Sequence, residues 1–211
     1  MNIIGDIAGR FDELMLLLVQ MPKDEKIILV GDLVDRGPKS KEVIEWAMST
    51  PNVITLMGNH EHMMIDYLLN TGLYGPRIWE MNGGDKTLDS YYDSETGDVV
   101  IPKEHLEWLK NLPKFYKEEG LYISHAPLRS TELGYKEEIQ DFLWNRNPPP
   151  KVPGVFQIFG HNSSMKKYGD YSICIDDCSK RKLTGIHWPS KKIYQQDYLP
   201  ILRSVEINPE D

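Results

Sequence analysis

Short apolar runs alternate with amphipathic stretches over the first 70 residues of the chain. The runs are rich in β-branched residues, which is typical of buried strands, whereas apolar residues at intervals of three and four predict helices between them. The predicted strands lie at Ile3-Ile4, 26–31 and 52–57, and the predicted helices lie at 10–20, 39–49 and 60–70. This alternating order predicts a parallel sheet.

The pattern changes at about residue 72. From there to about residue 120, glycines punctuate short helical pieces, of which 102–112 is the clearest, so we expect a helical insertion that forms one wall of a cleft. Another helix is predicted at 136–143, and strands are predicted at 121–125, 155–160, 172–176, 182–187 and 192–197. The close spacing of the last three strands predicts antiparallel pairing. The acidic tail, 204–211, is expected to be loose.

Composition narrows the class of protein. A chain of 211 residues fits a single domain, 1–211, and 40% hydrophobic with 27% charged residues is ordinary for a globular protein. The net charge of −8 makes nucleic acid an unfavoured partner, because no basic surplus exists to release counterions. The longest early apolar run, 14–19, is too short for a membrane span. With only two cysteines, Cys174 and Cys178, we expect a reducing, cytoplasmic compartment.

Side chains that ligate metals or move protons follow five of the predicted strands. Each strand stops at a small residue, after which comes one of Asp6, Asp32, Asn59, His125 and His161. Loops at the carboxyl ends of strands converge on one crevice in open α/β sheets, so we expect these side chains to gather. The mixed oxygen and nitrogen set suits manganese, iron or zinc, and one bridging carboxylate would let it hold two ions. Taken singly, each aspartate could cap a helix and each histidine could be a core residue.

Several segments resemble the signatures of the phosphoprotein phosphatase (metallophosphoesterase) family. The five main ones lie at 5–9, 31–37, 58–61, 124–126 and 160–162. Three more are similar to the small bacterial and bacteriophage lambda type of protein phosphatase, at 63–66, 82–85 and 144–146. The resemblance runs from residue 2 to about residue 187. It implies an α/β fold in which two packed mixed β-sheets are flanked by helices, with the metals at one edge.

The resemblance also implies a ligand set and a cofactor. Two divalent metal ions would be held by Asp6, Asp32, Asn59, His125 and His161. The resemblance makes Asp32 the bridge, since a negative charge holds two cations together against their mutual repulsion. Manganese is favoured, with iron, zinc or nickel as alternatives.

Four residues match the catalytic and substrate-binding positions of the family. His60 would protonate the leaving oxygen while Asp35 orients its ring, although the same two residues could form a purely structural pair. Arg36 and Arg146 would grip phosphate, since guanidinium offers a planar fork for two phosphate oxygens. We interpret three tryptophans as packing residues, namely Trp79, Trp108 and Trp188.

The chain departs from the family at one important position and at two lesser ones, namely Asn162, where a threonine is usual, and 175–177, which lacks the glycine that commonly follows. A histidine that binds the first metal is usual at residue 8, and here the residue is Ala8, which cannot coordinate a metal. We therefore expect a weakened first site and an impaired enzyme. Ala8 could mark a natural pseudophosphatase that binds phosphorylated ligands without turning them over. It could equally be a substitution that inactivates an active enzyme, which we favour because the other ligands and the Asp35–His60 pair are retained.

The function that the resemblance implies is hydrolysis of phosphate monoesters by metal-activated water. The expected substrates are phosphoserine and phosphothreonine in proteins, so the partner would be a phosphoprotein or a phosphorylated small molecule. Hydrolysis of dinucleoside polyphosphates is the enzymatic alternative, because it shares the motifs and attacks an anhydride instead. Other nucleotide phosphohydrolases remain open, and so does a non-catalytic binding protein.

Overall fold

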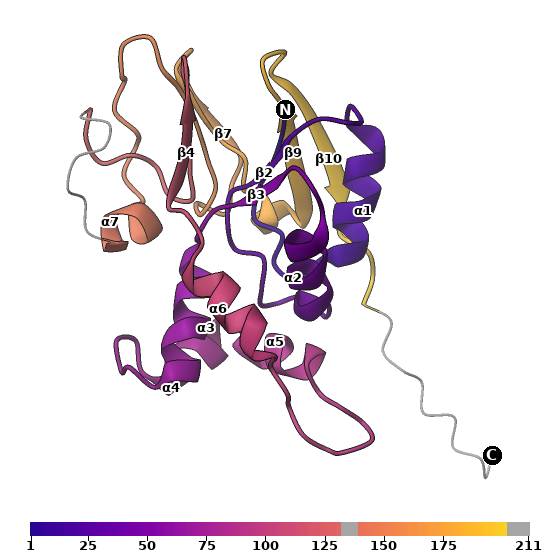
Figure 1. The fold of residues 1–211 in the computed structure, drawn as a ribbon. Helices are drawn as coiled ribbons and strands as arrows, with labels where there is room; N and C mark the ends of the chain where they lie inside the picture. The colour runs from indigo at the N-terminus through magenta and orange to yellow at the C-terminus, as the bar shows by residue number, and fades with distance from the viewer. Residues whose placement is uncertain (132–138, 202–211) are drawn as a thin grey trace.

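The computed structural model describes residues 1–131 and 139–201, in which ten strands form two five-stranded sheets (Figure 1). The first sheet, in the order β10-β9-β1-β2-β3, contains β1 (Asn2–Ile4), β2 (Ile27–Leu29), β3 (Val53–Thr55), β9 (Lys182–His187) and β10 (Lys192–Asp197). The second sheet, in the order β4-β5-β6-β8-β7, contains β4 (Phe115–Glu118), β5 (Leu121–Ser124), β6 (Phe156–Phe159), β7 (Lys166–Tyr168) and β8 (Ser172–Cys174).

Both sheets are mixed. In the first, β1, β2 and β3 run parallel, while β9 is antiparallel to β1 and to β10. In the second, β5, β6 and β8 run parallel, while β4 and β7 are antiparallel edge strands. Parallel strands end at the same edge of a sheet, so each sheet collects three carboxyl ends there.

Alternate residues of each strand build two different cores. Ile3 and Ile28 pack between the sheets together with Ile123 from the second sheet. Their neighbours Ile4 and Leu29 point to the other face and pack against helices. Side chains alternate across a strand, so continuous apolar strands bury both faces. The sheets therefore pack face to face, and the first sheet is also covered on its outer side.

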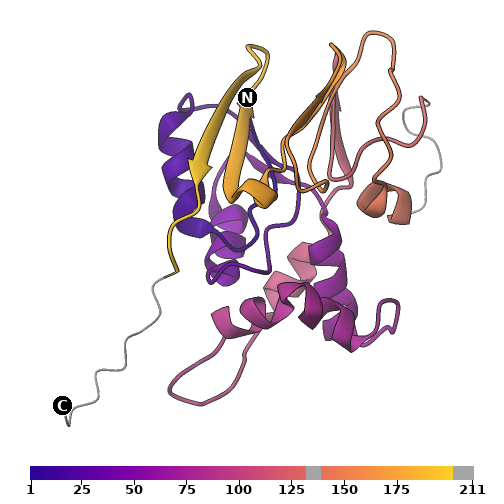
Figure 2. The same cartoon turned by 180° about the vertical axis from the view of Figure 1, so that it is seen from behind.

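Helices cover the outer face of the first sheet and one end of both sheets. The outer face is covered by α1 (Phe11–Gln20) and α2 (Ser40–Ser49). A helical group lies under the sheets in both views and contains α3 (Asn59–Leu69), α4 (Pro76–Trp79), η1 (Glu80–Gly84), α5 (Asp85–Ser90) and α6 (Lys103–Lys110) (Figures 1 and 2). The remaining pieces are α7 (Ile139–Trp144) and η2 (Cys178–Lys180).

The structure confirms the α/β fold class, with two packed mixed sheets flanked by helices, and the parallel opening. The predicted antiparallel pairing of the last three strands is only partly right. β9 and β10 pair as expected, but β8 joins the other sheet, where it pairs with β6 and β7. The sequence pattern does not predict β4 or β7, because these edge strands carry charged, largely exposed residues.

Some predictions fall partly outside the described residues. Of the helix expected at 136–143, the structure describes α7, whereas 136–138 and the acidic tail 204–211 lie outside the described residues. The stretch 72–120 contains the short helices and ends in β4, and the single-domain organisation stays a prediction. Within 1–131 and 139–201, no helix is long and apolar enough to cross a membrane.

Candidate metal centre and acid–base pair

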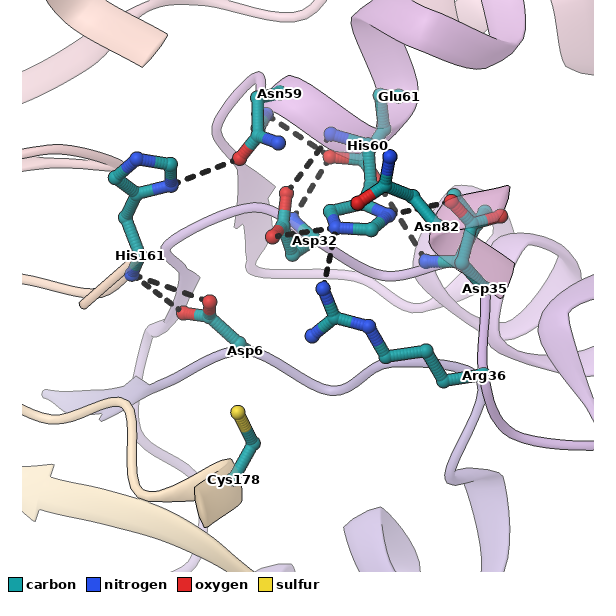
Figure 3. A network of polar contacts seen from close by, with 12 residues as sticks. Asp6, Asp32, Asp35, Arg36, Asn59, His60, Glu61, Asn82, His161 and Cys178 are labelled. Carbon is teal, nitrogen blue, oxygen red and sulfur yellow. Dashed lines mark hydrogen bonds and ion pairs between the residues drawn. The ribbon is translucent and has the colours of Figure 1, made fainter. Parts of the chain in front are cut away.

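Four of the five predicted metal ligands bring their side chains together: Asp32, His125 and His161 offer ligand atoms within 4.8 Å of one another, and the amide oxygen of Asn59 contacts both imidazoles. The fifth, Asp6, lies beside them and accepts the backbone N–H of His161 (Figure 3). Asp6, Asp32 and Asn59 follow the carboxyl ends of β1, β2 and β3, and His125 and His161 follow those of β5 and β6. Each of these side chains is at most 6% exposed. Both sheets therefore supply the polar groups of this one site.

Acceptor atoms converge at the centre of this site. His125 Nδ1 lies 3.0 Å from the carbonyl oxygen of Val30, to which it donates, so Nε2 of the neutral ring carries a lone pair. That Nε2 lies 2.8 Å from Asn59 Oδ1 and 3.4 Å from Asp32 Oδ1. His161 Nδ1 lies 2.9 Å from the same amide oxygen. The lone pairs of His125 Nε2 and Asn59 Oδ1 face one another and fit a cation between them, and His161 Nδ1 adds a third when its ring proton is on Nε2.

The charge states favour the same interpretation. Burial lowers the pKa of His125 and lowers the pKa of His161 to about 3, which keeps both rings neutral. Burial opposes the charge of Asp32, but the nearby imidazoles, His125 first, and the N–H of His60 bring its pKa to about 2. A carboxylate with two neutral imidazoles suits manganese, iron or zinc, so these residues fit the divalent metal that the family uses.

The side of the site near Asp6 is built differently. Asp6 accepts the backbone N–H of His161 at 3.1 and 3.2 Å. Burial, followed by the negative charges of Asp176 and Asp32, raises the pKa of Asp6 well above its ordinary range. Ala8 is buried here, and its methyl group offers no lone pair. Of the predicted ligands, this side therefore holds only carboxylates.

Left-handed backbone is concentrated in the loops that present the site. Ala8, Asp32, Asp35, Arg36 and His161 all have φ values between 50° and 75°. This region is uncommon for residues other than glycine, and aspartate and histidine tolerate it better than alanine does. Such strain persists where the surrounding structure fixes the loop. Ala8 and Arg36 are the two of the five that do not belong to the residue types favoured in this conformation.

Glu61 organises the Asp32 loop, although it was not among the predicted site residues. Its carboxylate accepts the backbone N–H groups of Gly58 (2.9 Å), Asp32 (2.8 Å) and Leu33 (2.7 Å). Burial, followed by the charge of Asp32, raises the pKa of Glu61 to about 7. The sequence contained a signal for this role, because Glu61 stands three residues after Gly58, the spacing of a capping box.

The predicted acid–base pair is formed beside these residues. His60 Nδ1 lies 2.5 Å from Asp35 Oδ2, and both side chains are buried. Burial alone would lower the pKa of His60, but Asp32 and Asp35 raise it above its ordinary value. A ring that keeps its proton near neutral pH has the property a general acid needs.

The helical group holds Asp35 from its other side, which corrects the interpretation of Trp79 as only a packing residue. Trp79 Nε1 donates to both Asp35 oxygens at 3.0 Å, and Thr87 Oγ1 donates to Oδ1 at 2.7 Å. The backbone N–H of Asp35 lies 2.9 Å from Thr87 Oγ1 and 3.1 Å from Ser40 Oγ. Trp79 and Asp35 are 44 residues apart, so no local sequence pattern predicts their contact.

The two predicted phosphate-binding arginines lie at the rim and are exposed. Arg36 Nη2 lies 3.0 Å from His60 Nε2, and its backbone N–H donates to the carbonyl oxygen of Gly83 at 3.1 Å. Arg146 Nη1 donates to the carbonyl oxygen of His161 at 3.0 Å. The guanidinium groups therefore sit against opposite parts of the site, one near the acid–base pair and one near the histidines.

Comparison with known proteins identifies a family for this arrangement. The sequence model described as calcineurin-like phosphoesterase matches residues 2–165. A symmetrical bis(5'-nucleosyl)-tetraphosphatase from Dechloromonas aromatica is 34% identical over 166 residues, which cover 69% of this chain and 56% of that protein. Serine/threonine-protein phosphatase 1 from Salmonella typhimurium is 27% identical over 176 residues, which cover 78% of this chain and 79% of that protein.

A solved structure agrees in fold. The crystal structure of a candidate diadenosine tetraphosphatase superimposes with a TM-score of 0.70 and covers 94% of both chains at 17% identity. At 17% identity, this similarity supports a shared fold only. The chain spans about half the length of the nucleosyl-tetraphosphatases that it matches, with matches covering 42% and 56% of two of them.

Proposed function

This chain belongs to the calcineurin-like phosphoesterase family, and from that premise we propose that it is a metal-dependent phosphohydrolase acting on dinucleoside polyphosphates. The observation that carries the proposal is the set of lone pairs from Asp32, Asn59 and the two histidines beside the His60–Asp35 pair. The similar nucleosyl-tetraphosphatases support this substrate class ahead of the phosphoproteins that the sequence motifs first suggested.

The predicted ligands would hold two ions. Asn59, His125 and His161 would bind one of them, Asp6 the other, and Asp32 would bridge both. Manganese is the favoured metal, with iron, zinc or nickel as alternatives. When bound, divalent ions polarise the phosphoryl group and lower the pKa of the attacking water.

The protein side chains supply positioning and a proton. Arg36 and Arg146 would bind the non-bridging phosphoryl oxygens through paired N–H groups. Arg36 now lies against His60 Nε2, so its movement to the phosphate would free that nitrogen to face the leaving oxygen. His60 would then protonate the leaving oxygen, while Asp35 keeps the Nδ1 proton and the orientation of the ring.

Hydrolysis of phosphoserine or phosphothreonine in proteins is the second candidate. The observation in its favour is length, because the match to the Salmonella protein phosphatase covers 79% of that protein and 78% of this chain. By contrast, the matches cover only 42% and 56% of two nucleosyl-tetraphosphatases. The two candidates differ in the leaving group, since an alkoxide requires a proton more than a phosphate does.

We also propose a cytoplasmic setting. Cys174 and Cys178 are free thiols, which is the ordinary state of cysteines in a reducing compartment. The net charge of −8 keeps nucleic acid an unfavoured partner. A small phosphorylated anion therefore suits the chain better than a polyanionic surface.

The test compares diadenosine tetraphosphate, a phosphoserine peptide and an aryl phosphate, each with added manganese. The chain is assayed both as it stands and as Ala8→His. We expect the largest kcat/KM for the dinucleotide with both proteins. A preference for the peptide would favour the second candidate. Tight binding of phosphorylated ligands without turnover by either protein would contradict the enzyme and support a pseudophosphatase.

A further inference from the structure

The loop between α3 and α4 carries a tyrosine, Tyr74, whose hydroxyl group reaches α7 on the other side of the site. In both views α7 lies above this loop (Figures 1 and 2). Trp144 Nε1, at the end of α7, donates to Tyr74 Oη at 2.9 Å. We propose that Tyr74 is a positioning residue for phosphate binding, because it holds Trp144 and thereby the turn that presents Arg146. The inference rests on the proposed function in taking Arg146 as a ligand of the phosphoryl group.

Three hydrogen bonds meet at the Tyr74 hydroxyl group. Trp144 Nε1 and, at 3.4 Å, Gln140 Nε2 donate to its oxygen from α7. The hydroxyl proton is left to His62 Nδ1 on α3, which lies 2.8 Å away. Burial lowers the pKa of His62, so its ring is neutral and able to accept this proton. Both acceptor positions and the donor of the hydroxyl group are thus occupied, which fixes the Tyr74 side chain between two helices.

The loop that presents Tyr74 is itself attached to α3. Asp66, on α3, accepts the backbone N–H groups of Leu73 and Tyr74 at 2.8 and 2.9 Å. The same carboxylate accepts the hydroxyl group of Thr71. The rings of Tyr74 and His62 also meet edge to face, with centroids 5.5 Å apart. Tyr74 is therefore anchored to the helix whose first residue is a predicted metal ligand.

The turn after α7 touches His161 at two points. The Trp144 ring lies edge to face with the imidazole, with centroids 5.9 Å apart and an angle of 88°. Two residues later, Arg146 Nη1 donates to the carbonyl oxygen of His161 at 3.0 Å. Between them, Asn145 Nδ2 donates to the carbonyl oxygen of Pro127 at 2.8 Å. Fixing Trp144 therefore fixes the start of a short turn whose last residue carries the guanidinium group.

Arg146 needs such support because its side chain is exposed. A long exposed side chain loses rotamer freedom when it binds phosphate, and a backbone that is already in place reduces what remains to be ordered. The other predicted phosphate ligand, Arg36, is held directly by the helical group, through its backbone N–H and the carbonyl oxygen of Gly83. The helical group thus positions both arginines, Arg36 by its own backbone and Arg146 through Tyr74.

Tyr91 provides a matched control. Its hydroxyl group lies 2.8 Å from His105 Nδ1, and the two rings meet with centroids 5.7 Å apart. This pair repeats the contact between Tyr74 and His62 but stays within the helical group, because His105 belongs to α6. Tyr91→Phe therefore removes a comparable hydrogen bond that does not lead to α7. Trp144→Phe removes the bond to Tyr74 from the α7 side.

The experiment measures the binding of inorganic phosphate to the full chain by calorimetry with manganese present, together with kcat and KM for an aryl phosphate. Tyr74→Phe should weaken phosphate binding and raise KM by roughly three- to tenfold, on the scale of one lost hydrogen bond. We expect little change in kcat, because the lost contact serves binding only. Trp144→Phe should give the same result, and the double variant should be no weaker than Trp144→Phe alone. Tyr91→Phe should change neither quantity.

A cycle with Arg146 tests the path of the effect. In the Arg146→Ala background, Tyr74→Phe should cause no further weakening, because the guanidinium group that it positions is gone. If Tyr74→Phe fails to fold, as shown by its melting curve, Trp144→Phe takes its place in the cycle.

Unchanged phosphate affinity in the folded variant would overturn the inference, as would equal weakening by Tyr91→Phe or further weakening of Arg146→Ala. A fall in kcat at constant KM, or no phosphate binding by the unaltered chain, would overturn it too. Phosphate affinities that change as expected, without turnover of any phosphate ester, would instead count only against the proposed function.

Discussion

The two sides of the metal centre use different chemistry. One side gathers neutral donors, the imidazoles of His125 and His161 and the amide oxygen of Asn59, around the charge of Asp32. The other places Asp6 near Ala8, where the negative charges of Asp176 and Asp32 oppose its own. Both sides lie at the carboxyl ends of parallel strands. The contrast therefore comes from the residues in the loops and not from the fold.

Because the two sides differ in charge, a bound cation changes their electrostatics to different extents. Neutral lone pairs in a buried pocket repel one another weakly, so the histidine side can keep its geometry without an ion. Buried like charges repel strongly, and Asp6 has Asp32 and Asp176 near it. The acidic side is therefore the one whose electrostatics a cation changes most. Asp32 belongs to both sides and couples them.

The largest effect should come from removing the shared charge. Asp32→Asn takes away the carboxylate that we propose as the bridge, so we expect both ions to be bound poorly and turnover to fall by roughly three orders of magnitude or more, which corresponds to about 4 kcal/mol of transition-state stabilisation. Elemental analysis after dialysis and steady-state kinetics with manganese measure the two losses. Asp12→Asn, at an exposed carboxylate paired with Lys39, should change neither.

Ala8→His should strengthen the acidic side directly. An imidazole adds a neutral donor beside Asp6, and histidine tolerates the left-handed backbone at φ 50° better than alanine. We expect turnover to rise by roughly one to three orders of magnitude at low manganese, with little change in melting temperature. A variant that binds two ions tightly and stays as inert as the parent would argue for a binding protein.

His60→Asn tests the proposed general acid. An alkyl ester needs its leaving oxygen protonated, so its hydrolysis should slow by roughly 10²–10⁴, while an aryl ester should slow far less. The expected loss for a dinucleoside polyphosphate lies between the two, because phosphate is a better leaving group than an alkoxide. Equal losses for all three substrates would make the His60–Asp35 contact structural.

Trp79→Phe should give a smaller effect of the same kind. The change removes the indole donor to Asp35 and leaves Thr87 in place, so the orientation of His60 is loosened but not lost. We expect roughly a tenfold loss for alkyl esters and a smaller loss for aryl esters, on the scale of one hydrogen bond to a charged group. Trp108→Phe, at a half-buried packing position, should leave the ratio between substrates unchanged.

These residues show what a sequence can predict about such a site. The residues at strand ends and the ordered motifs predict Asp6, Asp32, Asn59, His125 and His161, because each stands directly after an apolar run. Asp176 also follows such a run, 172–175, but the segment 175–177 lacks the glycine that commonly follows in the family, and no role was predicted for its carboxylate. A single carboxylate in a sequence can be assigned a role only where a motif predicts its place in a site.

Long-range contacts and sheet membership are harder to predict. Trp79 reaches Asp35 because the short helices after α3 fold back under the sheets, which no local pattern records. β8 lies close to β9 in sequence, but its apolar residues pack between the sheets, and it pairs with β6. The parallel opening was predictable since strands and helices alternate there with short links.

The smallest effect concerns stability without metal and its pH dependence. His161 has a pKa of about 3 in the folded chain because it is buried, against 6.5 for an exposed ring. Between these values the unfolded chain binds a proton that the folded chain excludes. This contribution is therefore fully present above pH 6.5 and is lost as the pH falls, at up to about 1.4 kcal/mol per pH unit.

The carboxylates change stability in the opposite direction. The raised pKa values of Asp6 and of Glu61, the latter about 7, mean that the folded chain holds protons there that the unfolded chain releases, so their contribution declines as the pH rises. The pH dependence of unfolding measured for one protein alone would therefore add the two opposite contributions. The difference between the chain and His161→Asn isolates one proton, measured by urea unfolding in chelator between pH 5 and about 7. If the free energy of unfolding depends on pH with the same slope in both proteins, His161 is protonated in the folded chain. It would then have no neutral ring to offer a cation.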